Sequence, residues 1–83
     1  MEKCYNFNGT CARNVTFEKT PDGKITNVRF NGGCNGNLKG IAALCEGMFA
    51  EDIISRLEGI KCGYKNTSCP DQLALALEKD INT

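Results

Sequence analysis

The run Asn66-Thr67-Ser68-Cys69-Pro70-Asp71 stands directly before a segment rich in leucine and alanine, residues 72–81, and together they predict a C-terminal helix. Proline lacks a backbone N–H and has φ near the helical value, so Pro70 fits the first helical position and Cys69 is expected to cap the helix. Unpaired N–H groups and the macrodipole at a helix N-terminus stabilise a thiolate, the form of cysteine that binds metals and attacks electrophiles. The alternative is that one of the two preceding hydroxyl residues caps the helix and Cys69 only packs.

The length and charge of the chain limit the classes of function. Its 83 residues predict one domain, residues 1–83, with a core thin enough that a bound metal or a homodimer partner would add to its stability. Ten basic residues balance ten acidic ones, so no net field would attract the chain to nucleic acid or to an anionic membrane. The sequence has no apolar signal segment and no run of membrane-spanning length, so we expect a cytoplasmic protein.

Cysteine is the residue type on which the chemistry of this chain would depend. In the reducing cytosol, its six cysteines are expected as free thiols, metal ligands or catalytic groups rather than as three disulfides. The chain has no histidine, which excludes a Cys–His nucleophile pair and zinc sites with mixed Cys and His ligands. Catalysis or metal binding would therefore use thiols.

Two segments alternate apolar and polar residues, as half-buried strands do: residues 11–19 and residues 24–31. Between them, Pro21-Asp22-Gly23 has the chemistry of a tight turn, because Pro presets φ and Gly accepts a positive φ. The three pieces predict an antiparallel hairpin, to which residues 4–10 could add a third short strand.

Three helices are expected after the hairpin, over residues 38–45, 50–57 and 70–81. Cys45 lies on the apolar stripe of the first of these and is expected in the core. The last helix is expected to bury apolar residues at steps of four, namely Leu73, Leu77 and Ile81. The order predicts an α+β fold, with an antiparallel sheet of two or three strands followed by three helices packed on one face.

A glycine-rich segment, residues 31–37, precedes the first predicted helix and has Cys34 at its centre. Glycines allow backbone N–H groups to approach a ligand closely, which favours a cradle for a phosphate or nucleotide, with Lys39 nearby. The residues expected to form this cradle are Gly33, Asn35, Gly36 and Asn37. The segment lacks the spacings of the P-loop and of dinucleotide-binding turns, so nucleotide binding is an alternative to thiol chemistry.

Three cysteines occupy junctions between loops and regular elements: Cys11 before the first long strand, Cys34 in the glycine-rich segment and Cys69 at the last helix. Cys62 lies a short loop before Cys69. Loop cysteines are free to converge, and four thiolates satisfy tetrahedral zinc or the iron of an iron–sulfur cluster. The alternatives are a thiol redox pair, in which Cys62 or Cys34 resolves Cys69, and six cysteines that only fill the core.

The pentapeptide at residues 67–71, together with residues 33–38 and 61–63, resembles the TSCPD domain, and the likeness covers about residues 4–80. The resemblance implies either a small stand-alone protein of unassigned function or a module like the C-terminal part of adenosylcobalamin-dependent ribonucleotide reductases. It thereby implies an association with DNA biosynthesis, with a ribonucleotide reductase subunit or a thiol-redox protein as partner. The radical chemistry of those enzymes belongs to a large barrel, so we do not expect ribonucleoside-diphosphate reductase activity from this chain alone.

The order of the cysteines is also similar to that in the IscU/NifU iron–sulfur scaffolds, onto which Cys11, Cys34 and Cys69 map. This second resemblance implies an IscU-like fold. Two positions differ from the scaffold pattern, because Arg13 stands where those proteins have aspartate and Ser68 where they have histidine. The fold analogy is therefore expected to hold better than the scaffold activity.

From these patterns we expect a small accessory module in which Cys11, Cys34, Cys62 and Cys69 bind zinc or an iron–sulfur cluster. A metal-free redox or protein-interaction module is the alternative from another class of function. Cys4 is given no role beyond packing.

Overall fold

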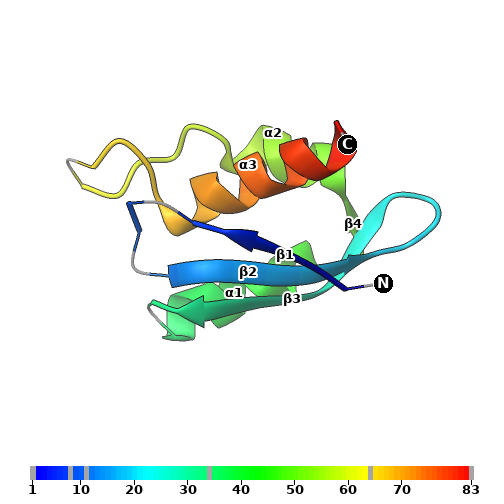
Figure 1. The fold of residues 1–83 in the computed structure, drawn as a ribbon, viewed down its shortest axis with the longest axis horizontal. Helices are drawn as coiled ribbons and strands as arrows, with labels where there is room; N and C mark the ends of the chain where they lie inside the picture. The colour runs from blue at the N-terminus through cyan, green and yellow to red at the C-terminus, as the bar shows by residue number, and fades with distance from the viewer. Residues whose placement is uncertain (1, 8, 11, 34, 64, 83) are drawn as a thin grey trace.

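The structure, a computed structural model, describes residues 2–7, 9–10, 12–33, 35–63 and 65–82 of the chain. The predicted α+β class is confirmed, with a sheet followed by three helices (Figure 1). In chain order the elements are β1 (Glu2–Asn6), β2 (Ala12–Lys19), β3 (Lys24–Gly32), α1 (Asn35–Cys45), β4 (Met48–Phe49), α2 (Ala50–Leu57) and α3 (Cys69–Ile81). The sheet has four strands, one more than the most that was expected, because β4 is only two residues long and too short to show alternation.

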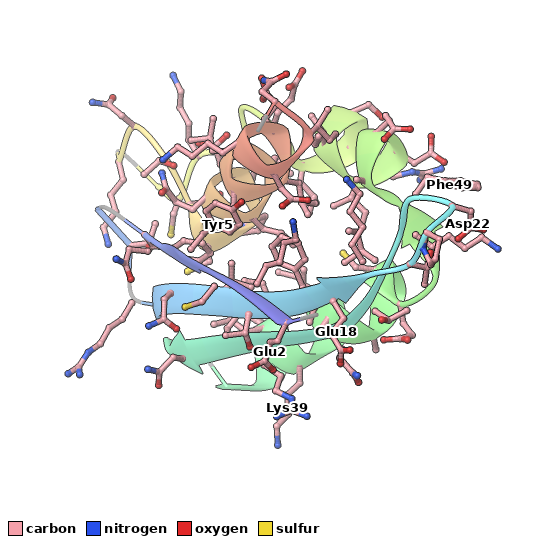
Figure 2. All side chains as sticks on the ribbon, turned by 45° about the vertical axis from the view of Figure 1, so that its right-hand side comes forward. Glu2, Tyr5, Glu18, Asp22, Lys39 and Phe49 are labelled. Carbon is pink, nitrogen blue, oxygen red and sulfur yellow. The ribbon has the colours of Figure 1, made fainter. Side chains whose placement is uncertain are left out.

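The strands form one antiparallel sheet in the order β1-β2-β3-β4, and the helices share one apolar core on one of its faces (Figure 1). Val15 and Phe17 of β2 are fully buried in this core, as the alternation predicts. On the other face, Glu2 and Glu18 stand opposite each other across β1 and β2 (Figure 2). The pleat of the strands therefore separates a covered face from an open one.

Asn27 interrupts the alternation of β3. The pairing between β2 and β3 shifts register here, and Asn27 has a positive φ of 53°, so one extra residue is accommodated as a bulge. As a result Ile25 and Val28, three positions apart, both enter the core. The bulge is held by polar contacts, because the Asn27 N–H donates to Glu46 Oε1 at 3.0 Å and its amide Nδ2 donates to Glu18 Oε1 at 2.7 Å.

Helix α3 supplies the centre of the core. Leu73 and Leu77 are fully buried as predicted, but the prediction for Ile81 is wrong, since 41% of its surface is exposed. Successive residues of an α-helix are rotated by about 100° around its axis. Ile81 therefore lies about 80° from Leu73 around the axis, whereas Asp80 lies within about 20° of Leu73. The buried position in the last turn therefore belongs to Asp80.

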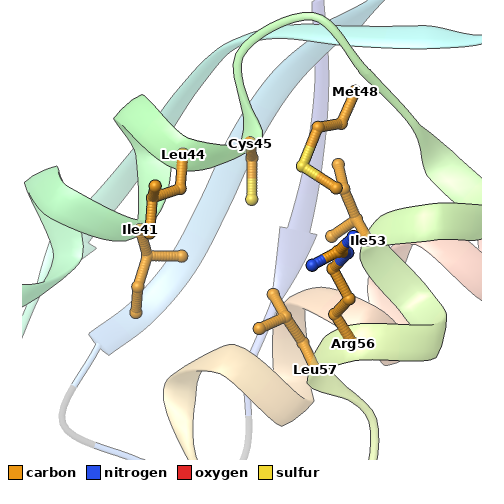
Figure 3. A pocket seen from close by; sticks show the side chains of 7 residues that line it. All are labelled: Ile41, Leu44, Cys45, Met48, Ile53, Arg56 and Leu57. Carbon is orange, nitrogen blue, oxygen red and sulfur yellow. The ribbon is translucent and has the colours of Figure 1, made fainter.

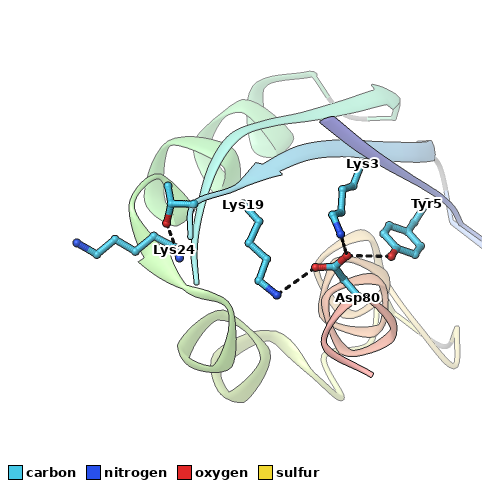
Figure 4. Close-up of polar contacts among 6 residues, drawn as sticks. Lys3, Tyr5, Lys19, Lys24 and Asp80 are labelled. Carbon is cyan, nitrogen blue, oxygen red and sulfur yellow. Dashed lines mark hydrogen bonds and ion pairs between the residues drawn. The ribbon is translucent and has the colours of Figure 1, made fainter. Parts of the chain in front are cut away.

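The carboxylate of Asp80 is met by three side chains from the sheet (Figure 4). Lys3 Nζ lies 2.6 Å from Oδ1, Lys19 Nζ lies 3.4 Å from Oδ2, and the Tyr5 hydroxyl donates to Oδ1 at 3.2 Å. The Asp80 side chain is only 1% exposed. We call these four residues the Asp80 cluster. It fixes the end of α3 to β1 and to the end of β2, and Figure 2 shows Tyr5 in the space between β1 and α3.

Two opposing effects set the pKa of Asp80. Burial alone would raise the pKa of this carboxyl, because it disfavours the charged form, but the hydrogen bonds from Lys3 and Lys19 outweigh it and hold the pKa below its ordinary value of 3.8. The same contacts raise the pKa of the Lys3 ammonium group, first through its hydrogen bond to Asp80.

Acid is expected to weaken the fold through Asp80. The unfolded carboxyl has a pKa of 3.8 and the folded one a lower pKa, so its stabilisation is complete above about pH 4 and is lost as the pH falls through the folded pKa. Asp80→Asn should lower the free energy of unfolding by about 2 kcal/mol at neutral pH, since it breaks charged hydrogen bonds. It should also flatten the decline in that free energy below about pH 4. Urea unfolding at several pH values measures both.

The matched control is Glu78→Gln, which neutralises an exposed acid two residues earlier on the same helix. It should change the free energy of unfolding by no more than about 0.5 kcal/mol and keep the native slope with pH. Equal losses in the two variants would contradict a stabilising role for the Asp80 cluster.

Candidate functional site

Ser68, and not Cys69, caps helix α3. The Ser68 hydroxyl accepts the Asp71 N–H at 3.1 Å and donates to the Ile60 carbonyl at 2.7 Å, while Cys69 is already the first helical residue. The predicted Cys69 cap is therefore wrong, because a hydroxyl oxygen accepts from the backbone far better than a thiol does. The alternative is confirmed: a hydroxyl residue caps the helix, and Cys69 packs half-buried against the core.

Asp71 joins the start of α3 to the loop before it. Its side chain accepts the Gly59 N–H at 2.7 Å and the Thr67 hydroxyl at 2.5 Å, and Gln72 Nε2 donates to the same Thr67 oxygen at 3.0 Å. Asp71 is 9% exposed and Ser68 is 5% exposed, so this polar network is buried. We call Thr67, Ser68 and Asp71 the Asp71 network.

Sequence reasoning missed the role of Asp71, although a signal was present. A Ser followed three residues later by an acid is the spacing of a capping box. Here only half of that motif forms. The Ser68 hydroxyl accepts the Asp71 N–H, but the Asp71 carboxylate accepts the Gly59 N–H instead of the Ser68 N–H. The acid is thereby used to hold a loop rather than to close the helix end.

The loop that the Asp71 network holds contains Cys62. Its backbone is closed by two further hydrogen bonds, from the Cys62 N–H to the Thr67 carbonyl at 3.1 Å and from the Lys65 N–H to the Cys62 carbonyl at 3.0 Å. The Cys62 side chain is exposed to solvent. This arrangement places an accessible thiol next to the start of α3.

Cys62 and Cys69 line the same two cavities. One is a groove of about 340 Å³ against the first half of α1, where Asn37, Leu38 and Ile41 complete its wall. The other is a void of about 30 Å³ whose lining residues include Thr10 from the β1–β2 loop. A void of this size has room for an ion or one or two water molecules. Two predicted ligands, Cys62 and Cys69, are therefore brought together.

The other two predicted ligands, Cys11 and Cys34, lie outside the described residues. Their chain neighbours are described and lie at the same end of the molecule as the Cys62 loop, on the left in Figure 1. Thr10 lines the small void, and Gly33 packs so closely on Ala12 that a Cβ at Gly33 would lie 3.1 Å from the Ala12 nitrogen. Residues adjacent to all four predicted ligands therefore lie at one end of the fold.

The four described cysteines are free thiols in different environments. Cys45 is buried in the core as predicted, and burial raises the pKa of its thiol. Cys4 lies exposed on β1. Within the described part of the chain, no group of three Cys, Asp or Glu side chains could hold a metal ion.

The glycine-rich segment differs from the loop that was expected. Asn35, Gly36 and Asn37 already belong to the first turn of α1, so the helix starts three residues before the predicted position. Gly33 has a φ of +83°, and a Cβ there would lie 2.8 Å from Leu38 Cδ1. Close packing of Gly33 against Ala12 of β2 and Leu38 of α1 therefore accounts for this glycine without a ligand. Nucleotide binding at Gly33, Asn35, Gly36 and Asn37 stays a prediction.

Two glycine substitutions test this packing explanation. Gly33→Ala should lower the free energy of unfolding by more than about 1 kcal/mol, because the residue has a positive φ and its Cβ would lie only 3.1 Å from the Ala12 nitrogen. Gly36→Ala should raise it by up to about 1 kcal/mol, since it lies in a helix with open space around it. Urea unfolding of both proteins is the measurement. A harmless Gly33→Ala would contradict the assignment.

The Asp71 network makes a separate prediction about the loop. In Asp71→Asn a neutral amide oxygen replaces the charged carboxylate oxygen that accepts the Gly59 N–H, so this hydrogen bond weakens. The Gly59 N–H should then exchange with solvent about tenfold faster, the effect of losing about 1.4 kcal/mol. Amide hydrogen exchange measures this directly. Asp52→Asn, an exposed acid in the first turn of α2, is the control and should leave Gly59 unchanged. Unchanged exchange in Asp71→Asn would show that the network does not hold the loop.

A family model described as the TSCPD domain matches residues 3–81 of the chain. The chain belongs to the TSCPD domain family. In this member, the pentapeptide at residues 67–71 builds the Asp71 network and provides Cys69.

No curated protein and no solved structure matches this TSCPD domain. The IscU-like fold implied by the order of the cysteines therefore stays a prediction. Over the described residues, the helices are too short or too polar for any of them to span a membrane.

Proposed function

We propose that this TSCPD domain binds zinc or an iron–sulfur cluster through Cys11, Cys34, Cys62 and Cys69. The observation that supports this proposal best is the void of about 30 Å³ whose lining residues include Cys62, Cys69 and Thr10. Thr10 precedes Cys11 directly, and Gly33, which precedes Cys34, packs on the residue after Cys11. Described residues next to each of the four cysteines therefore lie at one end of the domain, which supports the proposal.

The donor types at this end of the fold suit zinc and iron. Thiolates are soft ligands that select zinc, copper(I) and iron–sulfur centres, while carboxylates suit magnesium and calcium. The nearest buried acid, Asp71, uses both of its oxygens within the Asp71 network. A bound metal would cross-link the four segments that carry these cysteines, and in a domain of this size such binding energy adds directly to folding stability.

The biological role that we propose is accessory. The TSCPD resemblance associates the domain with ribonucleotide reduction, and a metal-bearing module could dock on a reductase subunit or serve metal and thiol handling. The exposure of the Cys62 thiol supports such a role, since it leaves the site accessible to a partner.

Thiol exchange is the second candidate, and the shared cavities of Cys62 and Cys69 favour it specifically. In this reaction the Cys69 thiolate attacks a disulfide of a partner protein and forms a mixed disulfide. Cys62 then displaces the second partner thiol and closes a Cys62–Cys69 disulfide. The partner disulfide gains two electrons and is reduced to two thiols, while Cys62 and Cys69 are oxidised to a disulfide. The two protons lost by Cys62 and Cys69 go to the two thiols of the partner.

Metal analysis of anaerobically purified protein distinguishes the two candidates. The metal proposal predicts about one zinc per chain, or iron with sulfide-to-iron absorption bands, and fewer than six titratable thiols. Cys62→Ser should lose most of the metal and keep its fold, because this residue is exposed. Removal of the metal by a chelator should also lower the melting temperature of the native protein.

Cys4→Ser is the matched control, since it removes another exposed thiol, one that lines neither cavity. It should retain the metal and the melting temperature. Six titratable thiols and no metal, even after reconstitution with zinc or with iron and sulfide, would overturn the metal proposal. Formation of a Cys62–Cys69 disulfide with a model disulfide would then support thiol exchange.

A further inference from the structure

Another cavity lies between α1, β4 and α2, and Figure 3 shows the side chains around it. Its volume is about 190 Å³, and its apolar walls come from Ile41, Leu44, Cys45, Met48, Ile53 and Leu57. Arg56 is the one charged residue among those lining it. We propose that this cavity binds a small carboxylate whose apolar body is about the size of a benzene ring.

The volume sets the size of the ligand. Drug-sized ligands and cofactors occupy pockets of roughly 300–1,000 Å³, so this cavity is too small for a nucleotide. An engineered apolar cavity of about 150 Å³ in another protein binds benzene, and this one is slightly larger at about 190 Å³. A single ring or a short branched alkyl group therefore fits, with its polar end at the mouth.

The walls favour an apolar body. The sulfur of Cys45 and the side chain of Met48 point into the cavity from the end of α1 and from β4 (Figure 3). Burial raises the pKa of the Cys45 thiol, so this wall is neutral at physiological pH. Leu44 borders the cavity with 77% of its surface exposed, and a ligand that covered part of it would gain hydrophobic free energy.

The charge at the cavity favours an anion. Arg56 is exposed, and within the described chain its guanidinium takes part in no ion pair. Asp52 lies one turn earlier on α2, a spacing that permits an ion pair, yet its carboxylate makes none with Arg56. No acidic residue is among those that line the cavity. A guanidinium presents paired N–H donors that match a carboxylate, which gives the ligand its proposed head group.

Methyl NMR of the full-length protein tests the proposal with two probes that share a phenyl ring. Phenylacetate should shift the methyl signals of Ile41, Met48 and Ile53. The methyl signals of Ile81, which is exposed in the last turn of α3 and does not line the cavity, should not shift. Phenylacetamide, the neutral analogue, should bind about tenfold more weakly, because it lacks the charge that meets Arg56. Arg56→Gln should weaken phenylacetate about tenfold and leave phenylacetamide unchanged.

The control variant is Lys79→Gln, which removes an exposed cation from the last turn of α3 and should leave both affinities unchanged. The proposal is overturned if millimolar phenylacetate moves none of the three methyl signals, or if the two probes bind equally well. A loss of affinity in Lys79→Gln equal to that in Arg56→Gln would also overturn it, since net charge alone would then explain binding. The result does not depend on the metal proposal, because neither of its two described cysteines, Cys62 and Cys69, lines this cavity.

Discussion

Helix α3 is held at both ends by a buried carboxylate, and the rest of the fold depends on how these two acids are satisfied. At the first turn, Asp71 lies near the positive end of the helix dipole, which stabilises its charge without a cation. At the last turn, Asp80 lies near the negative end, where a carboxylate is unfavourable. Lys3 and Lys19 supply the compensating charge from the sheet. The same residue type therefore needs different partners at the two ends.

This difference divides the domain into two regions. The Asp80 cluster joins α3 to β1 and β2 and acts on the core, because its partners are side chains of the sheet. The Asp71 network acts on the Cys62 loop, because its partners are loop groups such as the Gly59 N–H. The core can remain fixed while the loop end carries the accessible thiols. In many binding sites, reactive groups lie on loops that a rigid scaffold of helices and strands holds in place.

Sequence periodicity predicted the hairpin, the three helices and the burial of Cys45, since each follows from alternation or from an apolar stripe. It missed β4, which is two residues long, and the bulge at Asn27, which no alternation pattern indicates in advance. It placed Ile81 in the core because the four-residue spacing of Leu73 and Leu77 was extended by one more step. In the last turn of α3, however, the buried face of the helix passes through Asp80 and not through Ile81. At the site, the fixed φ of Pro70 predicted the start of α3 to within one residue. The N-cap, however, is Ser68 and not Cys69, because a hydroxyl oxygen is a better hydrogen-bond acceptor than a thiol.

The described cysteines differ in the reactions available to them because they differ in burial, and not because of their positions in the sequence. Cys45 is 3% exposed, and a raised pKa keeps its thiol protonated, so it behaves as part of an apolar wall. Cys62 is exposed, and the half-buried Cys69 lines the same two cavities at the start of α3. A thiol must reach solvent or a ligand before it can bind a metal or exchange with a disulfide. Of the described cysteines, only this pair combines access with a shared cavity, which is why the proposed chemistry lies at the loop end and not in the core.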